Sequence, residues 1–273
     1  MPTVTSKDGT RIAFDRIGAG PALILVDGAL CSRSFGPMPK IAPHFAPNFT
    51  VFTYDRRGRG GSGDTQPYDA AREIEDLAAL IAEAGGSASL LGISSGAALA
   101  LEATAAGLSV DKLVLYEPPY IASLNGAAVP DHRARLKELL AANRRGAAVR
   151  YFLRDMVTVP APAVWLMTAM VPIWSKLKAV AHTLPYDVAV LRGFGLPKES
   201  AATIRVPTLV AAGDKTQPRL LDVVAQLAKV IPGAQRLILK GQTHNVSGAA
   251  LAPPVTEFLK AAIPERPALR AVS

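Results

Sequence analysis

The chain places a serine between two glycines, in the segment Gly92-Ile93-Ser94-Ser95-Gly96. An apolar run typical of a strand precedes the motif (residues 88–94), and an alanine-rich helical pattern follows it (residues 95–107). A serine on a sharp strand-to-helix turn presents its hydroxyl at the carboxyl edge of a sheet, where ligands bind in open α/β folds. The motif is short, and a plain connection built from small residues is the alternative. We identify Ser94 as the candidate nucleophile.

A serine hydroxyl needs a base to take its proton. His244, in "LKGQTHNVSG", follows the last predicted strand, in a loop that returns to the same sheet edge as Ser94. The other three histidines precede a strand or lie in a predicted helical segment, where packing or solvent contact explains them: His44, His132 and His182. We therefore predict that His244 is the general base.

Alternating strand and helix patterns position these two side chains. Strand patterns cover residues 10–17, 22–28, 49–55, 88–94, 112–119, 207–214 and 235–241. Helical patterns cover residues 68–86, 95–107, 220–233 and 253–262. Such alternation predicts an α/β fold with a mostly parallel twisted sheet and helices on both faces.

The middle of the chain breaks this rhythm. Residues 118–199 suggest several helices interrupted by prolines and no convincing strand. We therefore expect an α/β core formed by residues 1–117 and 200–273, with residues 118–199 inserted as a helical cap after the sixth strand.

Composition limits the partners of the protein. The chain has 273 residues and a net charge of +8, and the predicted cap holds eleven Lys or Arg against five Asp or Glu. These cations are spaced as on solvated helices and lack interleaved aromatic residues, so we expect no nucleic acid. No apolar run is long enough for a membrane span, and no signal-peptide pattern occurs near the N-terminus.

The sequence also indicates which cofactor and cellular compartment to expect. Cys31 is the single cysteine, which excludes an internal disulfide and favours a reducing cytoplasm. Neither a metal-ligand spacing nor a dinucleotide fingerprint occurs, so we expect no cofactor. The expected partner is a small-molecule substrate, and a homodimer is compatible with the sequence.

Four segments together resemble the serine α/β-hydrolase family over nearly the whole chain: "LVDGAL", "YDRRGRGGSG", "GISSG" and "GQTH". The resemblance implies one antiparallel strand near the N-terminal edge of the sheet and a capped, esterase-like member. It also implies an oxyanion hole made by the backbone N–H groups of Ala29 and Ser95. The family commonly has a loop-organising histidine at the position of Asp27. Asp27 either takes over the hydrogen bonds of that histidine or, as a bare carboxylate, opposes the charge that develops in the oxyanion hole.

The acid that orients His244 has two candidates. At the position where the family usually has an aspartate, this chain has Thr216, which cannot ionise, and Asp214 lies two residues early. Glu117 closes the strand pattern at residues 112–119, which is the sixth strand in the family's order. The end of this strand is another place where the fold is known to carry this acid. A carboxylate buried there without a partner would be costly. We favour Glu117, keep Asp214 as the alternative, and note that Glu117 could instead pair with an arginine or cap a helix.

A serine nucleophile indicates acyl transfer, and we expect a small to medium, mainly uncharged ester or lactone. Cap residues that could line an acyl pocket are apolar: Tyr120, Trp165, Met167, Met170, Trp174 and Phe194. We expect Tyr120, Trp165, Met170 and Trp174 to bind substrate, although packing of cap on sheet would also explain them. Perhydrolysis, C–C bond hydrolysis and a non-catalytic ligand-binding homologue are the alternatives.

Overall fold

An eight-stranded sheet forms the core of the structure, a computed structural model that describes residues 1–121 and 130–262. The strand order is β1-β2-β4-β3-β5-β6-β7-β8. Strand β2 runs antiparallel to β1 and β4, and the other neighbouring pairs are parallel. The predicted sheet, including its antiparallel strand near the N-terminal edge, is confirmed. The strands are β1 (Thr3–Thr5), β2 (Arg11–Ile17), β3 (Ala22–Val26), β4 (Thr50–Tyr54), β5 (Ala88–Ile93), β6 (Val110–Tyr116), β7 (Thr208–Gly213) and β8 (Gln235–Leu239).

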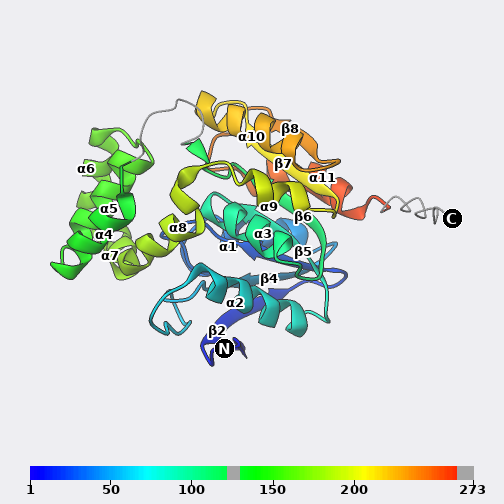
Figure 1. Cartoon of the computed structure of the whole chain (residues 1–273), viewed down its shortest axis with the longest axis horizontal. Helices are drawn as coiled ribbons and strands as arrows, with labels where there is room; N and C mark the ends of the chain where they lie inside the picture. Colours follow the sequence, from blue (N-terminus) through cyan, green and yellow to red (C-terminus); the bar gives the residue numbers. More distant parts are fainter. Residues whose placement is uncertain (122–129, 263–273) are drawn as a thin grey trace.

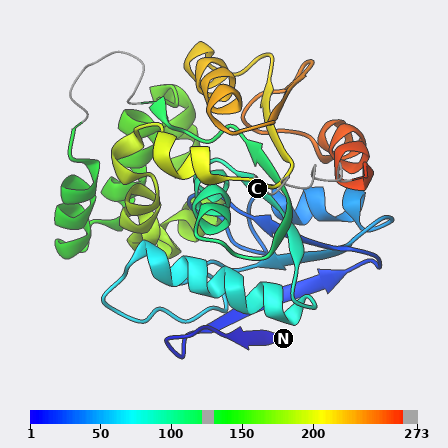
Figure 2. The same ribbon diagram turned by 45° about the vertical axis from the view of Figure 1, so that its right-hand side comes forward.

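Helices cover both faces of the sheet (Figures 1 and 2). Successive side chains of a strand point to opposite faces, so Ile24 and Val26 join one apolar core while Leu23 and Leu25 join the other. The first core includes residues of α2 (Ala70–Glu83), α3 (Ser95–Ala105) and α10 (Pro218–Val230). The second includes α1 (Met38–Phe45) and α11 (Gly248–Lys260). Two buried faces explain why the central strands are apolar throughout.

Between β6 and β7, the residues that the structure describes form helices joined by short loops, with no strand. Helices α4 to α7 gather at one end of the molecule, while α8 and α9 lead back over α3 (Figure 1). The predicted boundary at residue 199 falls inside α9, and residues 122–129 of the predicted cap lie outside the described residues. The elements are α4 (His132–Ala141), α5 (Arg145–Tyr151), the π-helical turn η2 (Phe152–Met156), α6 (Ala161–Ala169), α7 (Val171–Ala179), the 3₁₀ turns η3 (Ala181–Thr183) and η4 (Arg192–Phe194), α8 (Leu184–Val190) and α9 (Lys198–Thr203).

The junction between β5 and α3 is packed so closely that only glycine fits beside it. A Cβ atom on Gly92 would lie 2.5 Å from the Cα of Ala97. A Cβ atom on Gly96 would strike the backbone carbonyl oxygens of Val26 and Asp27, at the end of β3. Both glycines therefore allow α3 to begin directly against the neighbouring strand.

We predict that Gly96→Ala lowers the free energy of unfolding by about 1–3 kcal/mol, because the added methyl forces backbone atoms apart. Gly146→Ala is the matched control, since its Cβ would lie 3.6 Å from the Trp174 ring, an ordinary contact, within a helix. Chemical denaturation of both variants measures the difference. Equal stability of the two variants would contradict the close packing at residue 96.

Candidate active site

Ser94 occupies a strained turn between β5 and α3. Its backbone has φ 57° and ψ −128°, a conformation with positive φ that non-glycine residues rarely adopt. The neighbouring strand β6 holds this turn, because the amide of Ser94 donates to the carbonyl of Tyr116 at 3.0 Å. The side chain is half-buried and faces a cavity beneath the cap helices. A serine held in this way keeps its hydroxyl accessible at the sheet edge.

His244 lies in the loop between β8 and α11 and lines the same cavity as Ser94. Its Nδ1 atom is 2.7 Å from Oε2 of Glu117. The Glu117 side chain is fully buried, whereas 37% of the His244 side chain is exposed. A buried carboxylate on Nδ1 fixes the ring orientation and leaves Nε2 for proton transfer.

Glu117 directly follows β6 and is surrounded by donors. Its Oε1 accepts from the amide of Gly213 at 2.9 Å, and its Oε2 accepts from the hydroxyl of Thr216 at 2.9 Å as well as contacting His244. Its backbone also has a positive φ of 47°. These contacts satisfy the buried carboxylate without an arginine or a helix N-terminus among its recorded partners.

Asp214, the alternative acid, lies apart from the histidine. Its side chain is exposed and accepts a hydrogen bond from the amide of Gly241 at 2.6 Å. Thr216, at the position where the family usually has its acid, instead donates to Glu117. Of the two candidates, the structure brings Glu117 and not Asp214 to His244.

The two candidate oxyanion donors, Ala29 and Ser95, line the cavity together with Ser94 and His244. The amide of Ser95 lies in the first turn of α3, where helix amides have no partner within the helix. Ala29 follows β3, the strand that pairs with β5. The site thus combines a serine, a histidine held by a carboxylate, and two neighbouring amides.

Asp27 lies next to this group and is almost completely buried, with 3% of the residue exposed. Its Oδ1 accepts from the amide of Gly28 at 2.9 Å, whereas Oδ2 has no hydrogen-bond partner among the residues that the structure describes. Burial raises the pKa of Asp27 to about 7, against the opposing effects of the Gly28 amide, Cys31 and two arginines. A large share of this carboxyl is therefore neutral at neutral pH, which limits repulsion of an oxyanion.

The cavity walls are mainly apolar. The part around Ser94 and His244 is closed by side chains from the segment after β6, the cap and α10: Pro119, Ile121, Phe152, Met156, Val188, Leu191, Phe194 and Leu220. A more open part continues past Phe35, Leu153, Met167, Ile173 and Leu177. Sequence reasoning missed most of these residues, although it included Met167 and Phe194 among the candidates.

The four residues predicted to bind substrate lie elsewhere. Trp165 and Met170 point to solvent, with 72% and 44% of their surfaces exposed. Tyr120 is buried in the main core, and Trp174 packs inside the cap beneath the guanidinium of Arg150, 5.9 Å from the ring centre. None of the four lines either part of the cavity. For Trp165, which lies in α6, the sequence offers no directional signal: this helix is apolar on nearly all sides, so its composition does not reveal which face meets the cavity.

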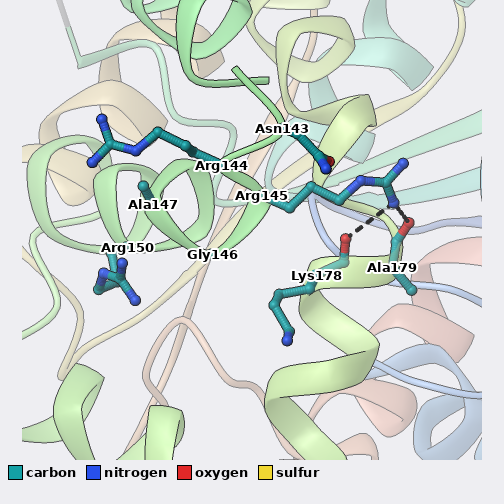
Figure 3. A pocket seen from close by; sticks show the side chains of 8 residues that line it. All are labelled: Asn143, Arg144, Arg145, Gly146, Ala147, Arg150, Lys178 and Ala179. Atoms are coloured by element: carbon teal, nitrogen blue, oxygen red, sulfur yellow. Dashed lines mark hydrogen bonds between the residues drawn. The ribbon is translucent and has the colours of Figure 1, made fainter. Parts of the chain in front are cut away.

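A second hollow, on the cap, is basic and contains none of these candidate groups (Figure 3). Its lining includes Arg144, Arg145, Arg150 and Lys178. Arg145 donates to the backbone carbonyls of Lys178 and Ala179, which ties α5 to the end of α7. The hollow brings together part of the positive charge of the cap but no nucleophile.

In the part of the chain that the structure describes, we find neither a group of metal-ligating side chains nor a membrane-spanning helix. Within residues 1–121 and 130–262, no three His, Cys, Asp or Glu side chains are grouped to hold a metal ion. The helices in these same ranges are too short or too polar to cross a bilayer.

We predict that Asp27→Asn makes stability less sensitive to pH. The unfolded carboxyl ionises near its ordinary pKa of 3.8 and the folded one near 7, so wild-type stability falls as pH rises between these values. The unfolding free energy of the variant relative to wild type should rise by about 2–3 kcal/mol from pH 5 to pH 8. Denaturant titrations at both values test this. A difference independent of pH would show that Asp27 ionises normally in the folded protein.

Comparison with known proteins agrees with this fold. The model of the alpha/beta hydrolase family matches residues 18–253. An alpha/beta hydrolase from Sphaerobacter thermophilus DSM 20745 is 47% identical, with a TM-score of 0.88 over 94% of this chain and 100% of that one. A hydrolase from Pseudomonas aeruginosa PA01 is 26% identical, with a TM-score of 0.77 over 95% and 98%.

More distant structures share the fold. An enol-lactonase from Burkholderia xenovorans LB400 is 18% identical, with a TM-score of 0.71 over 95% of this chain and 100% of that one, a likeness of fold alone. No curated protein matches the chain. The family match over most of the chain, together with the 47% identical structure, shows that this protein belongs to the alpha/beta hydrolase family.

Proposed function

We propose that the protein hydrolyses small to medium, mainly uncharged carboxylic esters or lactones through an acyl-enzyme on Ser94. The observation that carries the proposal is the arrangement of Ser94 and His244 on one cavity, with Nδ1 of His244 2.7 Å from the fully buried Glu117. Acyl transfer by a serine uses a histidine oriented by a buried carboxylate, and this geometry supports the proposal.

In the proposed reaction, Oγ of Ser94 attacks the substrate carbonyl carbon while Nε2 of His244 takes the hydroxyl proton. Glu117 holds the histidine and stabilises its positive charge. The carbonyl oxygen becomes negative and accepts hydrogen bonds from the amides of Ala29 and Ser95. His244 then gives its proton to the leaving alkoxide, so an alcohol departs and the acyl-enzyme remains.

Water completes the cycle. His244 takes a proton from a water molecule as the water oxygen attacks the acyl carbonyl, and the second oxyanion is held by the same two amides. Collapse of this intermediate breaks the bond to Oγ, and the proton on His244 returns to Ser94. The products are a carboxylic acid and the regenerated enzyme; a lactone gives the corresponding hydroxy acid.

The lining of the cavity supports an uncharged acyl group. Apolar side chains such as Phe152, Met156 and Leu220 form most of the wall near Ser94, and among the described residues neither part of the cavity is lined by a lysine or arginine. A substrate carboxylate would be buried there without a cation, which is costly.

We expect p-nitrophenyl esters from acetate to octanoate to be hydrolysed, with turnover reduced to background in Ser94→Ala. The chain-length optimum measures how much of the apolar cavity the acyl group fills. A fluorophosphonate probe should label the wild type and not the variant. If the wild type hydrolyses none of the esters and its Ser94 remains unlabelled, the fold acts as a binding scaffold and the proposal is wrong.

We also expect Glu117→Gln to lower kcat by about 10²–10⁴-fold, because the amide cannot stabilise a protonated His244. Asp214→Asn is the matched control. The side-chain oxygen of the new asparagine can still accept from the amide of Gly241, and activity should change less than about threefold. Steady-state kinetics on the best ester of the series test the pair. Equal or reversed losses would overturn the assignment of Glu117.

A further inference from the structure

Four charged side chains meet in the buried space between the cap and the core. Arg56 and Arg59 come from the loop after β4, Glu73 from α2 and Asp187 from cap helix α8, and each is at most 2% exposed. Arg56 pairs with both oxygens of Glu73, at 2.6 and 2.8 Å. Asp187 lies between the two arginines, with Oδ1 2.7 Å from Arg56 and Oδ2 2.8 Å from Arg59. The cluster is therefore neutral, as buried charges require.

Asp187 is held in its ionised form. Its burial would raise the pKa, but Arg59 and Arg56 lower it, and the net result is a pKa below the ordinary value. The carboxylate is thus a permanent anion at neutral pH, placed by the cap between two core cations.

Arg59 connects this anion to the first candidate oxyanion donor. Its second terminal nitrogen, Nη1, donates to the carbonyl oxygen of Gly28 at 2.5 Å. The carbonyl of Gly28 and the N–H of Ala29 belong to one planar trans peptide and point in opposite directions. Fixing the oxygen therefore fixes the direction of the Ala29 N–H, and a charged donor on the oxygen makes that N–H a stronger donor.

Ser95 connects the same anion to the second donor. Its hydroxyl donates to Oδ1 of Asp187 at 2.8 Å, and its own backbone N–H is the second candidate oxyanion donor. Arg56 supports the neighbouring peptide, since its Nη1 donates to the carbonyl of Asp27 at 3.3 Å. The carboxylate of Asp187 is thus linked to the Ala29 peptide through Arg59 and to Ser95 through the serine hydroxyl.

We propose that Asp187 is a positioning residue for the oxyanion hole, because its carboxylate holds Arg59 on the Gly28 carbonyl and holds the hydroxyl of Ser95. This inference rests on the proposed hydrolase function and extends it to the cap. Asp187 borders the cavity, but both of its carboxylate oxygens are engaged by Arg56, Arg59 and Ser95. It therefore acts through these residues, on amides that are used most strongly when the oxyanion forms. Its loss should therefore lower kcat much more than it raises KM.

The test compares Asp187→Asn with Asp76→Asn, measured by kcat and KM on the best p-nitrophenyl ester. Asp76 is a matched control because it also forms a buried pair with an arginine of the same loop: Arg57, at 2.7 Å. Arg57 contacts Asp8, Arg72 and Asp76 and has no recorded bond to the oxyanion loop. We expect Asp187→Asn to lower kcat about 10–100-fold with KM nearly unchanged, and Asp76→Asn to change kcat less than about threefold.

A second readout separates positioning from general damage to the fold. An alkyl trifluoromethyl ketone adds to Ser94 and places a negative oxygen in the oxyanion hole, whereas the corresponding alcohol binds the cavity without one. For Asp187→Asn, the inhibition constant of the ketone should rise in step with the loss of kcat/KM, and that of the alcohol should stay constant. Unchanged ketone inhibition would overturn the positioning role.

Ser95→Ala keeps the test decisive if Asp187→Asn does not fold. It removes one link to Asp187 while leaving every charge and both amides in place, and we expect a loss in kcat of about 3–10-fold together with weaker ketone binding. Full activity of Ser95→Ala alongside an unfolded Asp187→Asn would overturn the inference. If the wild type is labelled by fluorophosphonate but folded Asp187→Asn keeps its kcat, the hydrolase stands and the inference falls. A silent, unlabelled wild type overturns both.

Discussion

The carboxylate of Glu117 is fully buried, and a buried charge is stable only where donors surround it. Its donors come from three separate places: the end of β7, the loop after β7 and the loop after β8. This single group therefore links the end of β7 and the loops after β7 and β8 to the end of β6. His244 takes its orientation from its bond to Glu117, and the strand order brings its loop to the same edge of the sheet as Ser94.

Opposite Glu117, the candidate oxyanion loop depends on a different set of buried charges. Arg56 and Arg59 hold carbonyls of the loop after β3 and in turn contact Asp187 of the cap. One side of the site is thus organised within the sheet and the other through the cap. Substrate would bind between them, against apolar side chains such as Phe152 and Leu191.

Local patterns were sufficient to predict strands β2 to β8 of the sheet. Strands buried on both faces give continuous apolar runs, and the serine turn is marked by two glycines that packing requires. Strand β1 has only three residues, too few for a period, and α1 contains Pro43, which argues against a helix. Both elements were missed because their stability comes from tertiary packing, as where α1 packs against α11.

The site was predictable to the extent that chain order determines it. A carboxylate that directly follows β6 must lie at the carboxyl edge of the sheet, so Glu117 could be proposed from its position together with the family resemblance. The cavity lining could not, because the face that a cap helix turns inward depends on how that helix packs: Trp165 is exposed, whereas Met167, two residues later in α6, lines the cavity. Asp187 had no local signal, since its partners are 92, 128 and 131 residues away along the chain.

The ion cluster beneath α8 has a consequence for protein engineering. Exchanging the cap for that of a relative is an attractive route to new specificity in a fold whose core and insertion are separate in sequence. Here a graft without a carboxylate in register with Asp187 would leave Arg59 buried with no counter-ion among the partners it has now. A functional chimera must therefore carry over the anion or replace the arginine at the same time, so the cap and the loop after β4 form one unit of exchange.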